Sequence, residues 1–216
     1  MVRQPWIDIS QALTNDMAHW PGDTPFTREL TFSKAETGSV NIGQITTSLH
    51  TGTHVDAPFH FDNDGKTIEQ LDINDFIGKA RVFDICEAEE INVEVLKQFT
   101  WENVTRALFR TSFIDNLKQF PETIPTIDPA IAPFLASKGV KLFGIDLPSV
   151  DALDSKTLET HHAFAEHGIH ILENIVLSDI QPGVYELIAL PLAIHGADGS
   201  PVRAVIRKIK EEKQHG

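Results

Sequence analysis

The sequence predicts one α/β domain, rich in sheet, in which a mixed sheet carries flanking helices. Its second half alternates short apolar, β-branched runs with two well-punctuated helices, and its first half reads mostly as β structure. The 216 residues are 41% hydrophobic, and glycines and prolines are spread along the chain with no linker-like stretch. We therefore expect residues 1–216 to fold as a single domain.

The clearest strands of the first half are Asn41–Leu49 and Ala80–Cys86. Cys86 is the only cysteine, so an intrachain disulfide is impossible, and its place at the end of a strand predicts a buried thiol. The first half therefore contributes sheet rather than helix.

Two helices are expected in the second half because each has a start signal and a stop signal. The first spans 128–139, with Asp128 as N-cap and a proline at the first helical position. The second spans 154–168 and is capped near Asp154 or Ser155. A glycine ends each helix.

Strands flank these helices in the order strand, helix, strand, helix, strand, which indicates a partly parallel sheet. After them, Tyr185–Ile209 predicts two more strands around a turn with the sequence Gly-Ala-Asp-Gly-Ser-Pro. The three flanking strands are Arg106–Thr111, Val140–Ile145 and Ile169–Leu177.

The net charge of −13 argues against nucleic-acid and anionic-membrane partners, because the mean field of the protein repels both. A cation or a neutral or zwitterionic small molecule can still bind at a local site. The N-terminus lacks the charged start and apolar core of a signal peptide, and no run approaches the ~18 apolar residues of a membrane span. We expect a cytoplasmic protein.

The segment His50–His60, with the sequence HTGTHVDAPFH, concentrates chelating side chains. Gly52 and Pro58 exclude a helix, so the segment must be extended or looped. In an extended chain alternate side chains share a face, and the ionisable residues all fall on even positions, opposite threonines and apolar residues. These residues are His50, His54, Asp56 and His60.

Distance limits what this segment can bind. A straight chain would hold its two ends roughly 33 Å apart, whereas His54 and Asp56, about 7 Å apart at the backbone, can aim at one ion. We expect bends at Gly52 and Pro58 that wrap the segment round a site. The alternative is that these are surface histidines in a polar loop. The even positions shared by all four ionisable residues disfavour it. Imidazole with carboxylate suits zinc, manganese or iron(II), and the lack of cysteine ligands favours a catalytic site.

A second set of candidates lies more than a hundred residues later. Glu173 shares one face of the predicted strand with apolar neighbours, namely Ile169, Ile171, Ile175 and Leu177. Burying an unpaired charge there costs several kcal/mol, so Glu173 must reach a cation, take up a proton or lie at a site. An ion pair is the simple alternative. His161 and His162 lie on the preceding helix, and at least one could meet Glu173 across the helix–strand turn.

The pattern His-x-Gly-Thr-His-x-Asp-x-Pro-x-His resembles the signature of a family of metal-dependent hydrolases that includes the bacterial-type kynurenine formamidases, or arylformamidases. The histidine signature is specific to the superfamily, whereas the tryptophan segment and the SKTLETHH…ILEN segment are typical of the formamidase branch. The similar segments are His50–Phe61, Trp20–Phe26, Gly144–Asp151, Asp154–Asn174, Tyr185–Leu192 and Ser200–Val205.

The resemblance implies a swivelling β/β/α domain, usually a homodimer, with two zinc ions per chain. It implies hydrolysis of N-formyl-L-kynurenine to L-kynurenine and formate, a step in tryptophan degradation. Asp56 would bridge the two ions. The first zinc would be bound by His50, His54 and Asp56, and the second by Asp56, His161 and Glu173.

Three further residues receive roles from the same resemblance. His60 would donate and accept protons, Trp20 would lie against the aromatic ring of the substrate, and His162 would pack or orient. A related cyclic-amide hydrolase, such as an isatin hydrolase, and a non-catalytic metal-binding protein are the alternatives. Manganese or iron(II) are the alternatives to zinc.

Overall fold

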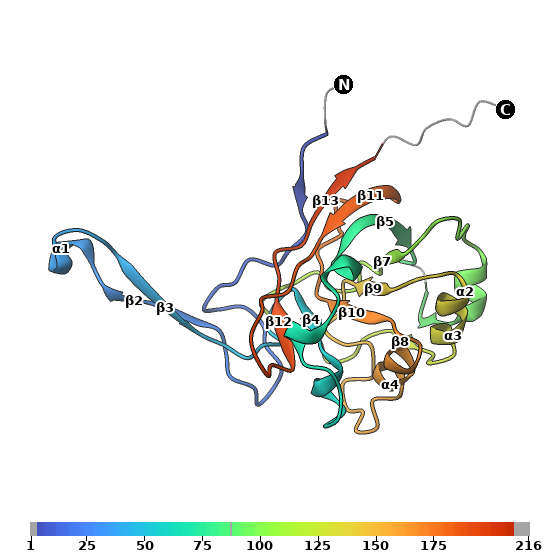
Figure 1. The fold of residues 1–216 in the computed structure, drawn as a ribbon, viewed down its shortest axis with the longest axis horizontal. Coiled ribbons are helices and arrows are strands. Elements are labelled where there is room, and N and C mark those ends of the chain that lie inside the picture. The colour runs from blue at the N-terminus through green and yellow to red at the C-terminus, as the bar shows by residue number, and fades with distance from the viewer. Residues whose placement is uncertain (1–3, 87, 210–216) are drawn as a thin grey trace.

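The computed structural model describes residues 4–86 and 88–209, and a nine-stranded sheet organises them (Figure 1). Its strands are β1 (Ile7–Asp8), β4 (His54–Asp56), β5 (Ile77–Asp84), β7 (Arg106–Arg110), β9 (Leu142–Ile145), β10 (His170–Glu173), β11 (Gly183–Ile188), β12 (Gly199–Pro201) and β13 (Val205–Lys208). Their order across the sheet is β1-β13-β11-β5-β7-β9-β10-β4-β12. The central strands β5, β7, β9 and β10 run parallel, and the flanking pairs are antiparallel. The predicted partly parallel, mixed sheet is confirmed.

The two faces of this sheet have separate cores. Helices α2 (Val93–Lys97), α3 (Ile131–Ser137) and α4 (Glu159–Glu166) gather on one face, where Leu96, Leu135 and Phe164 are fully buried (Figure 1). The other core contains side chains from β4, β5, β10, β11 and β13, because the sheet curls round it. The short 3-10 helices η2 (Ile68–Gln70) and η3 (Ile73–Phe76) help to close that second core. The predicted α/β class, rich in sheet, is confirmed.

A slender arm leaves this body (Figure 1). It is an antiparallel ribbon of β2 (Thr27–Phe32) and β3 (Ile42–Thr46), with the one-turn helix α1 (Lys34–Thr37) at its tip. The predicted strand in Asn41–Leu49 is therefore present, but it pairs outside the main sheet. A second small sheet pairs β6 (Glu90–Ile91) with β8 (Thr126–Ile127).

Both long predicted helices exist, but each begins a turn later than its cap signal. Asp128 Oδ1 accepts a hydrogen bond from the amide of Ala130, and Ser155 Oγ accepts one from the amide of Leu158. These bonds close isolated turns, and the backbone at Leu158 is left-handed with φ of 48°. Helix α4 therefore begins only at Glu159.

Two further expectations are wrong. The stretch read as a turn near the C-terminus contains β12, which pairs with β4, so this region has three strands instead of two. Cys86 is exposed, because β5 ends at Asp84 and the following turn carries the thiol outward. Within the described part of the chain, no helix has the length and apolar character needed to cross a membrane.

Candidate metal centre

Strand β4 presents the first chelating side chains. It lies between β10 and β12, with Glu173 opposite His54 on one side and Pro201 opposite His54 on the other. Val55 points into the core inside the curl, so its neighbours His54 and Asp56 face the opposite side, as the predicted parity requires. Because residues opposite each other on paired strands share a face, Glu173 joins them.

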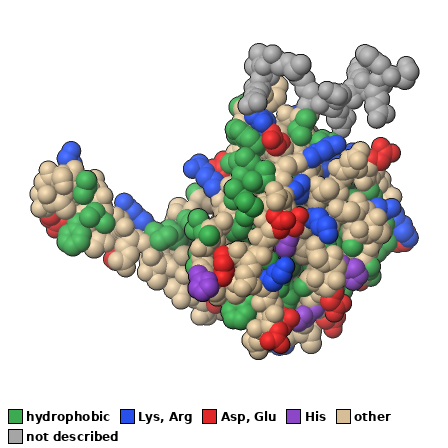
Figure 2. Space-filling view, viewed as in Figure 1, with side chains coloured by type: hydrophobic (Ala, Val, Ile, Leu, Met, Phe, Trp, Pro, Cys, Tyr) green, Lys and Arg blue, Asp and Glu red, His purple; other side chains and the backbone are tan. Residues whose placement is uncertain are grey.

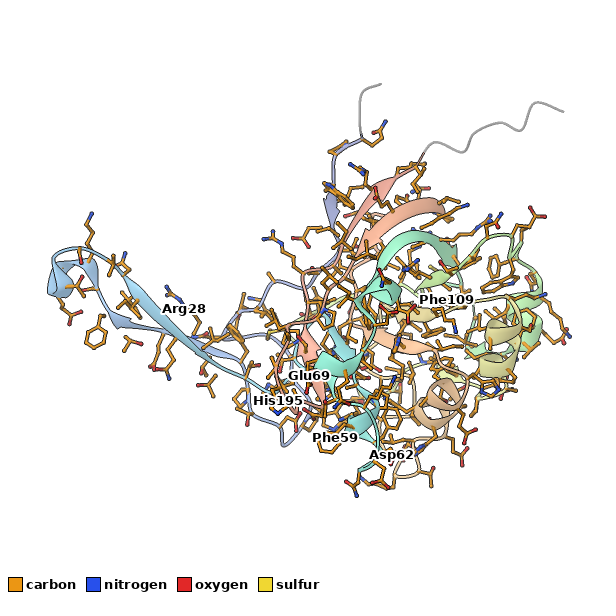
Figure 3. All side chains as sticks on the ribbon, viewed as in Figure 1. Arg28, Phe59, Asp62, Glu69, Phe109 and His195 are labelled. Carbon is orange, nitrogen blue, oxygen red and sulfur yellow. The ribbon has the colours of Figure 1, made fainter. Side chains whose placement is uncertain are left out.

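Two bends bring the rest of the segment to this face. Gly52 has φ of 66°, a left-handed conformation that favours glycine. Pro58 begins the 3-10 helix η1 (Pro58–His60), which turns His60 back so that its ring centroid is 3.9 Å from that of His50. Figure 3 labels Phe59 and Asp62, which lie before and after His60 in the sequence, at the edge of the body. The predicted bends at Gly52 and Pro58 are confirmed.

The structure brings the five predicted metal-binding residues into two groups that share Asp56. In the first group, His50 Nδ1 is 2.8 Å and His54 Nε2 is 3.3 Å from Asp56 Oδ1. In the second, His161 Nε2 is 3.6 Å from Asp56 Oδ2 and 3.9 Å from Glu173 Oε1. Within each group the donor atoms lie within 4.8 Å of one another.

This donor set fits divalent cations. Asp56 Oδ2 is buried and has no hydrogen-bond partner among the residues the structure describes. A buried carboxylate oxygen without a partner carries a large desolvation cost, which a cation between Asp56, His161 and Glu173 would remove. Nitrogen and oxygen donors without thiolate suit zinc, manganese or iron(II).

An outer acceptor fixes each of the three histidines in these groups. His54 Nδ1 lies 2.8 Å from the carbonyl oxygen of Gly52, and His161 Nδ1 lies 2.6 Å from a carboxylate oxygen of Asp151. His50 uses Nε2 instead, 3.0 Å from Asp198 Oδ2. With these outer nitrogens donating, the second nitrogen of each ring faces the shared Asp56 and would be free to bind a cation once it has lost its proton, the arrangement typical of metal-binding histidine.

The charges of the first group are coupled through its hydrogen bonds. Burial opposes a charge on His50, but the hydrogen bonds with Asp198 and Asp56 outweigh it and raise the pKa of His50 to about 10. Burial would raise the pKa of Asp56, but the imidazoles of His161, His50 and His54 hold it well below its usual range. Asp56 is therefore stabilised as an anion, and the proton held by His50 must be released before a cation can bind there.

In the second group, the pKa values of His161 and Glu173 are both raised. Burial disfavours a charged His161, yet Asp151 and Asp56 raise its pKa to about 10. Burial and the nearby charge of Asp56 raise the pKa of Glu173 well above its ordinary value, while its Oε1 accepts a hydrogen bond from the amide of Val150. Without a cation, Glu173 is thus stabilised in its neutral form.

His60 stands beside both groups and belongs to neither. Its Nδ1 lies 3.7 Å from Asp198 Oδ2, and its side chain is 33% exposed. Burial and the charge of His50 lower its pKa, so the ring is neutral at neutral pH. A third possible group combines His60 with His50 and Asp198.

A cleft opens over the centre and holds about 810 Å³ of space that is continuous with solvent. His60 and Trp20 both line it, and the Trp20 ring packs edge-on against Phe120 at 5.2 Å between centroids. His161 is buried in the centre, whereas His162 is exposed and its ring lies 5.2 Å from that of Phe61. The roles predicted for Trp20, His60 and His162 stay predictions.

Sequence reasoning missed two carboxylates. Asp151 caps α4 by accepting from the amides of Thr160 and His161, and it also holds the His161 ring. Asp151 ends the segment Gly144–Asp151, which the family resemblance had already singled out, and that resemblance is the signal that could have found it. Asp198 lay in the stretch read as a turn, and nothing local indicates that it meets His50.

Comparisons with known proteins identify the family of this chain. The family model Cyclase matches residues 7–152. The kynurenine formamidase of Bacillus cytotoxicus is 57% identical over 209 residues, which cover 97% of this chain and 100% of that protein. The chain belongs to the kynurenine formamidase family. The kynurenine formamidase of Bacillus cereus is 56% identical with the same coverage.

Solved structures share the fold of this formamidase-family chain. A structure described as a predicted metal-dependent hydrolase from Bacillus stearothermophilus superposes with a TM-score of 0.78 at 25% identity, covering 95% of this chain and 99% of that one. Isatin hydrolase A from Labrenzia aggregata superposes with a TM-score of 0.77 at 22% identity, covering 95% and 94%. At 22% identity the second likeness supports the fold alone.

Proposed function

We propose that this protein hydrolyses N-formyl-L-kynurenine to L-kynurenine and formate, in the breakdown of tryptophan. One observation carries the proposal: two potential metal-binding groups share Asp56 beside His60, in a chain 57% identical to a kynurenine formamidase. The reaction adds water across an aryl formamide C–N bond. It therefore requires a nucleophile made from water and a proton for the departing nitrogen.

Two divalent cations, with zinc as the preferred metal, would be bound at this centre. His50, His54 and Asp56 would hold one, and Asp56, His161 and Glu173 would hold the other. When bound, such ions lower the pKa of a water molecule and stabilise the negative charge that develops on a carbonyl oxygen. The side chain of Asp56 keeps the two places close, and Asp151 and Asp198 orient the imidazoles from outside.

His60 would carry the protons. An aniline nitrogen is a poor leaving group as an anion, so it must be protonated as the C–N bond breaks. Because its pKa is lowered, the imidazole of His60 is free to accept a proton from the attacking water and then deliver it to that nitrogen. Trp20, on the wall of the same cleft, would stack on the aryl ring.

The purified protein loaded with zinc tests this reaction against the alternative of a cyclic amide. We expect kcat/KM for N-formyl-L-kynurenine to exceed that for isatin at matched pH and metal loading. A preference for isatin would overturn the proposed substrate. Stoichiometric metal binding without hydrolysis of either compound would favour a non-catalytic metal-binding protein.

We also propose that the protein is a homodimer, with the arm of β2, α1 and β3 as part of the interface. Every residue of both strands is exposed, and Figure 2 shows hydrophobic side chains along the arm. Arg28, labelled in Figure 3, is one of the four charged residues of the arm. Exposed apolar side chains on a projecting ribbon need a partner surface. They are Leu30, Phe32, Val40, Ile42 and Ile45, each 44–60% exposed.

Sedimentation analysis of a double variant tests this interface. Phe32 and Ile42 are paired across the ribbon, so replacing both with serine removes adjoining apolar area. We expect the wild type to sediment as a dimer and the double variant as a monomer. Leu192→Ser, at a side chain 60% exposed on the body, is the control and should leave the dimer intact. A monomeric wild type would contradict the homodimer.

The remaining partner and location assignments rest on the sequence. The net charge of −13 favours a small-molecule substrate over nucleic acid or an anionic membrane. A cytoplasmic location is part of the same proposal, and cell fractionation would test it.

A further inference from the structure

The mouth of the cleft carries one acidic and one basic side chain that the proposed hydrolysis does not use. The charged residues that line this cleft, histidines apart, are Asp23, Lys156 and Glu173. Glu173 is buried at the metal centre, whereas Asp23 and Lys156 are exposed. The lining of the cleft therefore offers one exposed negative group and one exposed positive group to a ligand.

A tight turn holds Asp23 beside the aromatic wall. The amide of Asp23 donates to the carbonyl oxygen of Trp20 at 3.0 Å, so the indole and the carboxylate project from one turn. Ser48 Oγ donates to Asp23 Oδ2 at 3.0 Å, and among the described residues no side chain or amide donates to Oδ1. A ligand whose ring lies on Trp20 would thus meet a carboxylate close by.

Lys156 comes from a different part of the chain. It lies in the loop that leads into α4, where Ser155 Oγ accepts from the amide of Leu158. Ser155 and Leu158 line the same cleft. Over residues 4–86 and 88–209, the Lys156 ammonium has neither a carboxylate within 4.0 Å nor a hydrogen bond. Its charge is therefore available to a ligand.

We propose that Asp23 and Lys156 form a subsite for the free α-amino acid group of the substrate, with Asp23 binding its ammonium and Lys156 its carboxylate. This inference rests on the proposed function, because it assumes that the formamide end occupies the metal centre. N-formyl-L-kynurenine carries its amino acid group on a side chain ortho to the formamide. The aryl ring on Trp20 would therefore direct that group toward the mouth.

Charge complementarity supports a zwitterion over a simple anion. The chain has a net charge of −13, which repels a free carboxylate approaching the cleft. Lys156 offsets that repulsion locally, and Asp23 favours a ligand that brings a cation as well. The pair thus selects aryl formamides that carry an amino acid group over those that do not.

A truncated substrate tests the subsite directly. The zinc-loaded wild type, Lys156→Met and Asp23→Asn would each be assayed with N-formyl-L-kynurenine and with 2′-formamidoacetophenone, which has the same ring and formamide but no amino acid group. We expect each substitution to raise KM for formylkynurenine by about 3- to 10-fold with little change in kcat, the size of a partly exposed charge-assisted contact. The ratio of kcat/KM between the two substrates should fall by the same factor. Lys97→Met and Asp179→Asn, at exposed positions outside the cleft lining, are the matched controls.

The outcomes separate this inference from the proposed function. Hydrolysis of both compounds by the wild type, with a substrate ratio unchanged in both variants, would overturn the subsite and leave the function standing. Equal losses on both substrates would also overturn it, because they would indicate a structural role. A wild type that hydrolyses neither compound would overturn the function itself, and the subsite with it.

Discussion

Replacing His60 with alanine separates a proton carrier from a metal ligand. His60 belongs to neither of the groups that share Asp56, but it does form a third possible group with His50 and Asp198. If the first two groups hold the ions, the variant should keep both of them. If the third group holds one, the variant should lose it.

The structure sets the expected magnitudes. Loss of general acid–base catalysis lowers turnover by about 10²- to 10⁴-fold. This range corresponds to about 2.7–5.4 kcal/mol at about 1.36 kcal/mol per tenfold. The His60 side chain is 33% exposed and lies in a one-turn helix, so the free energy of unfolding should fall by less than about 1 kcal/mol.

The assay measures kcat for N-formyl-L-kynurenine together with metal per chain by elemental analysis. We expect kcat to fall at least about 100-fold in His60→Ala while the metal content stays at the wild-type value. His195→Ala, at a side chain 97% exposed, is the matched histidine control. A metal loss in His60→Ala equal to that in His54→Ala would refute the reasoning and make His60 a ligand.

Four further predictions concern the buried charges. Glu173→Gln should leave the melting temperature of the apoprotein nearly unchanged, because burial raises the pKa of Glu173 and keeps it neutral. Elemental analysis of the same variant should show one metal ion lost per chain. Full metal occupancy would contradict the role of Glu173 as a ligand. Asp151→Asn should weaken metal binding about 10- to 100-fold in a chelator competition, since Asp151 orients His161; unchanged affinity would count against it. Metal affinity should rise with pH, because His50 and His161, with pKa values of about 10, must release protons to bind. The same raised values stabilise the folded apoprotein below pH 6.5, and this stability should be lost as the pH rises through about 10, which thermal melts would follow.

Local patterns predicted the parts of the site that depend on local geometry. Strand alternation placed His54 and Asp56 on one face, and Gly52 and Pro58 marked the bends, because these features depend only on neighbouring residues. The same rule failed after Glu173. Asn174 has φ of 56°, so the alternation breaks there, and Ile175 packs in the core opposite to that of Ile171.

Features that depend on distant pairing could not be predicted locally. Asp198 meets His50 only because β12 pairs with β4, and a Cβ on Gly199 would lie 2.8 Å from His50 Cε1. The arm shows the same limit. An apolar, β-branched run such as that around Ile45 predicts a strand whether the strand lies in the main sheet or projects from it.

The central claim is that two ions at the centre shared by Asp56 support hydrolysis of the formamide. Elemental analysis of metal per chain, combined with the formylkynurenine assay before and after chelation, tests it most directly. We predict two equivalents of metal in the active protein, loss of activity in step with metal removal, and recovery when zinc is restored. Activity that survives complete removal of metal would contradict the account.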